Sequence, residues 1–161
     1  AKLLYLLPSG GRYICKLADL RQEHALMAAV REMNRRWRQC GLCVCGAQLE
    51  AVTYSIVPLG ARAGLVEEVP ESRNLCELSQ GYSFAGRHLR VLEALGGDAG
   101  RLDRLAATTV GYLTMSYVLG IRDGHDENLM LRSDGALFRV DLGYAFGRAP
   151  EVDAPAIFVP R

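Results

Sequence analysis

A chain of 161 residues can bury a core and has the length of one ordinary domain. Half of the residues are hydrophobic and 23% are charged, which is typical of a globular protein and not of a disordered one. The 19 Lys and Arg residues nearly balance the 18 Asp and Glu residues, so the net charge is +1. Because no overall positive field results, we expect no nucleic-acid partner, and any contact with a lipid surface must be local.

The five cysteines and the hydropathy pattern bear on the cellular compartment. An odd number of cysteines argues against a closed disulfide framework. Cys40, Cys43 and Cys45 have metal-like spacing, but no second Cys or His pair lies nearby to complete a four-ligand zinc site. No apolar run approaches the length of a membrane span, and the first residues lack the design of a signal peptide. We therefore expect reduced cysteines in an intracellular protein.

The N-terminal residues predict a hairpin followed by a helix. Apolar runs at residues 3–7 and 12–16 flank a Pro-Ser-Gly-Gly turn. A helix is expected to follow, with Asp19 as its N-cap. Four apolar residues in it recur at helical spacing and predict a buried face, namely Leu26, Val30, Met33 and Trp37.

The middle of the chain changes from strands to helices. After a turn at residues 41–46, runs rich in β-branched residues at 50–58 and 64–69 predict two strands. Pro70-Glu71-Ser72 marks a boundary. Short helices are then predicted at residues 74–78 and 86–95, with a flexible glycine-rich break at 96–100. The run at 102–119 is apolar nearly all round, which is typical of a helix buried in a core.

The stretch 120–143 carries the chemistry of the chain. Gly120 ends the buried helix, and a polar loop with Asp123, His125 and Asn128 follows it. Strands at residues 129–131 and 136–140, joined by a Ser-Asp-Gly turn, place Asn128 and Asp141 at the two ends of one hairpin. An amide oxygen and a carboxylate are hard ligands suited to Mg²⁺. The set fits phosphoryl transfer, with Asp123 and His125 in reach of the group that is phosphorylated. The alternative interpretation is a polar loop that only caps a helix and a hairpin.

Three stretches of the sequence carry a resemblance to a known family. The pattern D-x-H-x-x-N-x-x-L followed by G-x-L-F-x-x-D-x-G resembles the catalytic and metal-binding loops of the phosphatidylinositol 3-/4-kinase superfamily. Its usual order is Asp-Arg-His, unlike the His-Arg-Asp of ordinary protein kinases, and Asp precedes His here as well. D-L-R-Q-E at residues 19–23 is similar to the D-L-R-Q-D that follows the nucleotide-binding lysine of the lipid kinases. D-L-G-Y-A-F-G-R-A-P at residues 141–150 is most similar to class III phosphatidylinositol 3-kinases, the Vps34 type.

The resemblance implies an α+β, two-lobed kinase-like fold that is partial at both ends. Residues 1–70 would be the N-lobe up to the hinge, an antiparallel sheet with one helix and without its phosphate-binding loop. Residues 71–161 would be a mainly helical C-lobe without its last helices. The catalytic loop would occupy residues 120–131, and the activation segment residues 141–161, running as an extended loop.

The same resemblance implies a role for each matching residue. Lys16 would bind phosphate and take part in catalysis, and Glu23 would hold it in position. Asp123 and His125 would act on the attacking hydroxyl, and Asn128 and Asp141 would hold Mg²⁺. The nucleotide pocket would be formed by Ile14, Tyr54, Val66, Met130 and Val140, with Glu67 and Val69 at the hinge.

The implied activity is ATP- and Mg²⁺-dependent phosphorylation of the 3-hydroxyl of phosphatidylinositol, with Mn²⁺ as an alternative ion. The enzyme would be cytoplasmic and peripheral to intracellular membranes, with a regulatory protein subunit as partner. One alternative is a Ser/Thr protein kinase of the PI3K-related group, which residues 53–65 would also suit. A second is a pseudokinase or scaffold, because Gly124 replaces the arginine of Asp-Arg-His and the tail carries the acidic Glu151 and Asp153.

Overall fold

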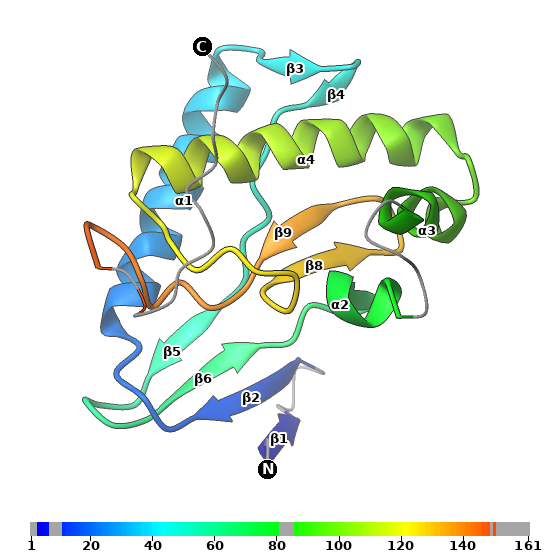
Figure 1. The fold of residues 1–161 in the computed structure, drawn as a ribbon. Helices are drawn as coiled ribbons and strands as arrows, with labels where there is room; N and C mark the ends of the chain where they lie inside the picture. The colour runs from blue at the N-terminus through cyan, green and yellow to red at the C-terminus, as the bar shows by residue number, and fades with distance from the viewer. Residues whose placement is uncertain (1–2, 7–10, 81–85, 149, 151–161) are drawn as a thin grey trace.

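The largest sheet has four antiparallel strands in the order β1-β2-β6-β5 (Figure 1). The computed structural model describes residues 3–6, 11–80, 86–148 and 150, and shows a mixed α/β protein with small sheets. The predicted hairpin forms the first two strands, and β2 ends at Lys16, so this lysine closes an inner strand. The strands of this sheet are β1 (Leu3–Leu6), β2 (Arg12–Lys16), β5 (Ile56–Pro58) and β6 (Gly64–Glu67).

The predicted strand at residues 50–58 is wrong over its first part, because only Ile56–Pro58 join the sheet. Helix α1 (Arg21–Gln39) engages the preceding segment instead. The side-chain amide of Asn34 accepts a hydrogen bond from the Ala51 N–H at 2.9 Å and donates to the Ala51 carbonyl at 2.7 Å. Arg31 donates to the Tyr54 carbonyl at 2.8 Å. Side chains of the helix thus replace a neighbouring strand as partners of this backbone.

The start of α1 differs from the prediction by one residue. Its N-cap is Leu20, which makes no side-chain cap. Asp19 instead accepts a hydrogen bond from the Arg21 N–H at 3.1 Å and pairs with the Arg21 guanidinium. The predicted apolar face is buried as expected, with Leu26 and Val30 almost fully covered. The helix therefore forms where the sequence predicts it, with a different cap.

A two-stranded hairpin, β3 (Cys43–Val44) and β4 (Ala47–Gln48), follows α1. The cysteines at positions 40, 43 and 45 lie exposed at this hairpin as free thiols. Within the described ranges, no group of three or more His, Cys, Asp or Glu residues is placed to hold a metal ion.

In its described residues, the second half of the chain is built on a three-stranded sheet and three helices. The sheet has the order β7-β8-β9. Helix α4 starts before the predicted residue 102, because Asp98 caps it by accepting from the Arg101 N–H at 2.8 Å. Of the predicted tail, residues 149 and 151–161 lie outside the described residues. These elements are β7 (Ser72–Asn74), α2 (Leu75–Leu78), α3 (Arg87–Leu95), α4 (Ala99–Val118), β8 (Leu129–Arg132) and β9 (Leu137–Arg139).

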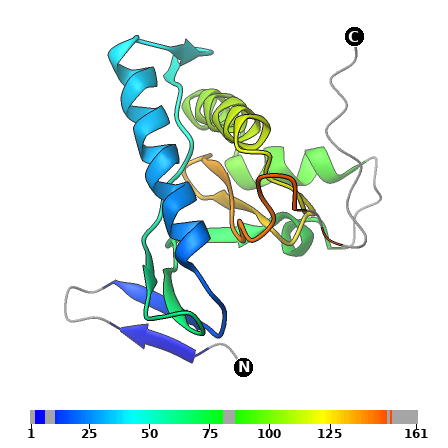
Figure 2. The ribbon, with the colours of Figure 1, turned by 90° about the vertical axis from the view of Figure 1, so that its left-hand side faces the viewer.

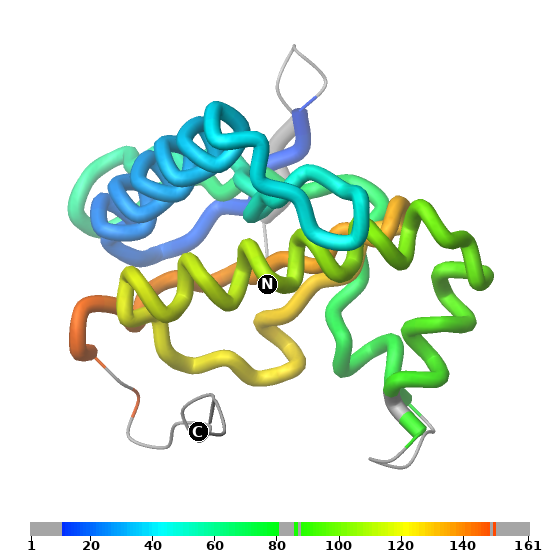
Figure 3. Tube along the Cα trace, turned by 90° about the horizontal axis from the view of Figure 1, so that it is seen from above, coloured from blue at the N-terminus to red at the C-terminus, as the bar shows by residue number. Residues whose placement is uncertain are grey.

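Helix α4 positions the hairpin that carries the candidate site. It runs along β8 and β9, and from its C-terminal end the chain doubles back through residues 120–128 (Figures 1 and 3). The Thr108 hydroxyl accepts from the Leu137 N–H at 2.9 Å and donates to the Arg104 carbonyl at 2.8 Å, which ties helix to strand. None of the helices in the described part of the chain is long and apolar enough to cross a bilayer.

One apolar cluster joins α1, the segment before β5, α4 and the β8–β9 hairpin. Figure 2 shows α1 starting beside the four-stranded sheet and running away from it, with the hairpin on one side. Tyr54 and Phe138 meet in this cluster with ring centroids 6.4 Å apart and planes tilted by 57°. The packing brings residues from both ends of the chain to one place.

We expect Gly111→Ala to lower the free energy of unfolding by roughly 1–3 kcal/mol, the usual cost of overpacking a core. A Cβ at this position of α4 would lie 2.1 Å from the Glu50 carbonyl oxygen, so helix and segment must separate. Urea unfolding measures the effect. The matched control is Gly100→Ala in the first turn of the same helix, where a Cβ meets only the Asp98 carboxylate at 3.3 Å. Equal stability of the two variants would contradict the close approach.

Candidate active site

A lysine and a carboxylate near the start of the chain meet a second carboxylate, distant in sequence, beside the hairpin. Lys16 ends β2, Glu23 lies in the first turn of α1, and Asp141 follows β9. The Lys16 ammonium lies 3.1 Å from Asp141 Oδ2 and 3.7 Å from Glu23 Oε1. The Glu23 side chain is 7% exposed and that of Asp141 is 47% exposed. The lysine therefore stands between a buried carboxylate and one that faces solvent.

Glu23 is anchored on two sides. Its Oε2 accepts a hydrogen bond from the Leu142 N–H at 3.3 Å, while Oε1 faces the lysine. Burial raises the pKa of Glu23, the ammonium of Lys16 opposes this, and the charge of Asp141 adds to it, so the pKa lies above its usual value. Glu23 thus holds both the lysine and the backbone that follows Asp141.

The polar loop brings Asp123, His125 and Asn128 into mutual contact. The Asn128 amide nitrogen donates to the Asp123 carbonyl at 3.1 Å and to Asp123 Oδ2 at 3.3 Å. It also lies 3.1 Å from His125 Nε2, which is 3.6 Å from Asp123 Oδ1. The Asn128 carbonyl accepts from the Val140 N–H at 2.9 Å, so this loop lies next to the residue that precedes Asp141.

Both aspartates of the site have left-handed backbone conformations. The φ angle is 70° at Asp123 and 61° at Asp141. Aspartate adopts this region more readily than most residues, but the conformation still costs free energy and is found most often at functional sites. The surrounding contacts must therefore fix both residues.

Arg139 is the member of the site that sequence analysis missed. It is 1% exposed, and its Nη2 donates to the carbonyls of Arg122, of Asp123 at 2.9 Å and, more weakly, of Asp141 at 3.4 Å. The sequence carried one signal for it, an arginine between Phe138 and Val140 in a short predicted strand. That signal also fits an ordinary exposed strand residue.

Most residues predicted for the nucleotide pocket lie on paired strands or at the edge of the main apolar cluster. Ile14 and Val66 are directly opposite each other on β2 and β6. Val66, Val69, Met130 and Val140 are partly buried and pack against the main apolar cluster. Partly exposed apolar side chains can form the walls of a pocket for a flat apolar ligand.

Tyr54 and Glu67, also predicted for that pocket, are in different surroundings. Tyr54 is 3% exposed, and burial together with the charges of Glu23 and Asp141 raises its pKa, whereas Arg139 opposes the shift. Among the described residues its hydroxyl has no hydrogen-bond partner. The Glu67 N–H donates to the Ser55 carbonyl at 2.9 Å, and its carboxylate accepts from the Ser55 N–H at 2.6 Å. The N–H and the carboxylate of Glu67 are therefore both bonded to Ser55, the residue before β5.

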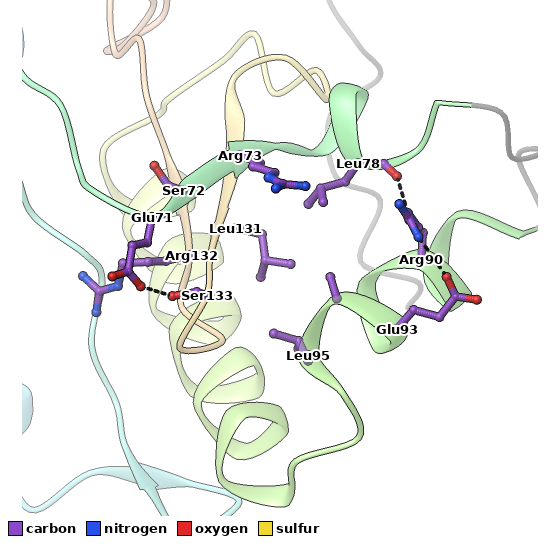
Figure 4. Close-up of a pocket in the computed structure, with 11 residues that line it drawn as sticks. Glu71, Ser72, Arg73, Leu78, Arg90, Glu93, Leu95, Leu131, Arg132 and Ser133 are labelled. Carbon is purple, nitrogen blue, oxygen red and sulfur yellow. Dashed lines mark hydrogen bonds and ion pairs between the residues drawn. The ribbon is translucent and has the colours of Figure 1, made fainter.

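A pocket of about 510 Å³ lies elsewhere, between β7, β8 and α3 (Figure 4). Leu78, Leu95 and Leu131 point into it, and Arg90 at its edge pairs with Glu93 at 3.1 Å. It shares no residue with the lysine and carboxylate cluster. We place the candidate active site at the cluster, because its ionisable groups contact one another and a perturbed carboxylate marks it.

The chain is similar to lipid kinases in sequence. Residues 93–160 match the family model described as phosphatidylinositol 3- and 4-kinase. The root isoform of phosphatidylinositol 3-kinase from Glycine max is 33% identical over 142 residues, which are 85% of this chain and 17% of that protein. Phosphatidylinositol 3-kinase VPS34 from Arabidopsis thaliana is 30% identical over 151 residues, 88% of this chain and 18% of that protein. The chain therefore spans less than a fifth of the length of these relatives.

We expect Glu23→Gln to change how stability depends on pH. Because the folded pKa of Glu23 is raised, the unfolded state ionises first, and the free energy of unfolding that depends on this residue falls as the pH rises above about 4.5. The glutamine variant lacks this fall. Urea unfolding between about pH 3 and pH 7 measures it.

The control is Glu32→Gln on the exposed face of α1. There Arg35 and Arg36 hold the pKa of Glu32 at about 2, so its stabilisation is present at neutral pH and is lost as the pH falls toward that value. The two variants must therefore differ from wild type with opposite signs of pH dependence. Equal signs would contradict the burial of an ionisable Glu23.

Proposed function

The chain belongs to the phosphatidylinositol 3- and 4-kinase family, and on that premise we propose that it forms part of an ATP- and Mg²⁺-dependent lipid kinase. The reaction proposed is transfer of the γ-phosphoryl group of ATP to the 3-hydroxyl of phosphatidylinositol. The observation that carries the proposal is the Lys16 ammonium held between Glu23 and Asp141. Kinases use this combination of a lysine, a helix glutamate and a metal-binding aspartate to bind phosphates.

Lys16 is suited to phosphate binding by its surroundings. Glu23 holds the lysine from the buried side at 3.7 Å, and the Lys16 side chain is still 32% exposed. An ammonium in this position meets negative charge that develops on a transferring phosphoryl group, and a fixed charge there needs no reorganisation. Glu23 acts through the lysine and is a positioning residue.

Asp141 and Asn128 have the chemistry of a magnesium site. Mg²⁺ takes carboxylate and amide oxygens and completes its shell with waters and phosphate oxygens. The Asp141 carboxylate is 47% exposed, and Asn128 uses its amide nitrogen, not its amide oxygen, in the hydrogen bond to Asp123. When bound, Mg²⁺ or Mn²⁺ neutralises charge on the phosphate oxygens.

Asp123 and His125 are placed to act on the acceptor hydroxyl. The Asp123 side chain is 20% exposed and that of His125 is 45% exposed, so both are open to a substrate. Asp123 orients the hydroxyl and accepts its proton, and His125 lies close enough to share this role. Asn128 holds the two in one arrangement through its amide nitrogen.

The adenine would lie against Ile14, Val66, Met130 and Val140, with Tyr54 behind them. Because the Glu67 N–H is bonded to Ser55, the Glu67 carbonyl is the group left for the adenine amino group. The Val69 carbonyl accepts from the Ser72 hydroxyl at 2.7 Å, which leaves the Val69 N–H as a donor to the ring. Residues 1–70 and 71–161 would then be the two lobes, and residues 141–161 the activation segment.

The membrane surface, a regulatory subunit and a cytoplasmic location follow from the same proposal. The relatives compared with this chain are phosphatidylinositol 3-kinases by name, which supports a lipid acceptor over a protein acceptor. A scaffold without turnover is the second candidate, because Gly124 removes the arginine that could brace the loop.

We expect Mg²⁺-dependent ATP binding by the full-length protein that contains this chain. Asp141→Asn removes one charge from the metal site and should weaken Mg²⁺-ATP binding at least about tenfold. Calorimetry with and without Mg²⁺ measures this. The matched control, Asp103→Asn in α4, should bind like wild type. A folded wild-type protein that binds no nucleotide would contradict the kinase proposal and favour the scaffold.

We expect phosphate from ATP to appear in phosphatidylinositol vesicles and not in a peptide pool. Mapping the labelled hydroxyl of the inositol ring tests the 3-position. Asp123→Asn should reduce the rate by about 100-fold or more, because it removes the group that takes the proton. Label in peptides alone would reject the lipid acceptor and support a protein kinase.

A further inference from the structure

We propose that Arg139 is the positioning residue that holds the catalytic loop in this chain. Its guanidinium reaches the loop from β9 and takes the place of the arginine that the family pattern has at position 124. The inference rests on the proposed function, because it concerns how Asp123 is held for that reaction. Three observations carry it: the contacts of the buried guanidinium, the space at Gly124 and the backbone of the two aspartates.

The guanidinium of Arg139 joins two segments through one nitrogen. Nη2 donates to the Arg122 carbonyl and, at 2.9 Å, to the Asp123 carbonyl, both in the loop before the hairpin. It also approaches the Asp141 carbonyl at 3.4 Å, after the hairpin. In the described part of the chain no ion pair joins Arg139 to a carboxylate. A guanidinium buried without such a pair depends on these carbonyls for its stability.

Because Gly124 has no side chain, the Arg139 guanidinium can lie beside it. A Cβ at this position would be 3.5 Å from Arg139 Nη1 and 3.3 Å from the Tyr112 hydroxyl oxygen. The φ angle of Gly124 is not positive, so its backbone does not require glycine. The side of the loop where a longer side chain would begin is therefore already occupied by Tyr112 and Arg139. The arginine absent from position 124 and the arginine present at 139 serve the same loop.

The carbonyls that Arg139 holds belong to residues that need holding. Asp123 and Asp141 have φ angles of 70° and 61°. A donor to the carbonyls of both fixes the peptide planes on which the carboxylates depend. A charged donor makes stronger hydrogen bonds than a neutral one. Arg139 thus links the residue proposed to take the proton with the residue proposed to hold the metal.

Loss of this link should affect turnover more than nucleotide binding. Among the described residues no hydrogen bond or ion pair joins Arg139 to Lys16, and its contact with the Asp141 carbonyl, at 3.4 Å, is longer than the 2.9 Å contact with Asp123, so the KM for ATP should change by no more than about threefold. A loop that is displaced by about 1 Å is expected to lower kcat by about 10- to 100-fold. Amide hydrogen exchange should rise in residues 121–128, because their local opening becomes easier, while α1 keeps its protection.

The experiment uses the full-length protein and a mutant cycle at the two positions. Arg139→Met and Gly124→Arg are made singly and together, and kcat, KM for ATP and hydrogen exchange are measured for each. Each single change should lower kcat, the second because two guanidinium groups compete for one space. The double variant should recover at least about tenfold relative to the product of the single losses, because the arginine is restored from the other side.

Two further variants separate positioning from general stability. Arg132→Met on β8 removes a partly buried arginine whose guanidinium pairs with Asp134 at 2.5 Å, outside the catalytic loop. It should lower stability without raising exchange in residues 121–128. Arg139→Lys keeps the charge but replaces the planar fork with a single ammonium, so it should fold and show an intermediate loss of kcat. If Arg139→Met does not fold, Arg139→Lys carries the test.

Two results would overturn the inference. Exchange that rises uniformly in Arg139→Lys, with kcat no lower than in Arg132→Met, would make Arg139 a structural residue. Single losses that multiply in the double variant would reject the exchange of roles with position 124. A wild-type protein that transfers no phosphate would reject the proposed function alone, because the exchange of residues 121–128 still reports on Arg139.

Discussion

The structure depends on the contact of the Lys16 ammonium with Glu23 and Asp141. Lys16 and Glu23 lie seven residues apart, on a strand and the helix that follows it, whereas Asp141 is more than 100 residues further along the chain. The charge of Asp141 meets the other two only when the sheet and the hairpin are packed against one core. Glu23 also accepts the Leu142 N–H, so one buried carboxylate fixes both the lysine and the backbone beside Asp141. The arrangement has a cost in free energy, because burial disfavours the ionised form of Glu23 and so raises its pKa.

The remaining site is organised around two aspartates in left-handed conformations. Hydrogen bonds from Asn128 and Arg139 hold the first, and contacts with Lys16 and Arg139 hold the second. Reactive groups held in uncommon backbone conformations are poised before a substrate arrives, which lowers the reorganisation that the reaction requires. The site is therefore a small polar network supported on a firm apolar cluster.

Sequence reasoning worked where signals are local. The helix containing Leu26 and Val30 and the hairpin after Asn128 follow from periodicity and turn chemistry over a few residues, and the structure confirms both. Sequence reasoning failed where contacts with residues distant in sequence determine the local structure. Residues 50–55 have strand-like composition, but Asn34 and Arg31 of α1 take up their backbone groups. Arg139 looked like an ordinary strand residue until the fold placed the carbonyls of the loop around it.

The sequence by itself determined the order of the elements, the family resemblance and the residue types needed for phosphoryl transfer, because these depend on neighbours along the chain. Tertiary structure alone decided that Lys16 pairs with Asp141, that Glu23 is buried, and that an arginine on β9 donates hydrogen bonds to a loop that has a glycine at position 124. The physical reason is that burial and charge pairing depend on distances in space, and packing sets these distances between segments more than 100 residues apart.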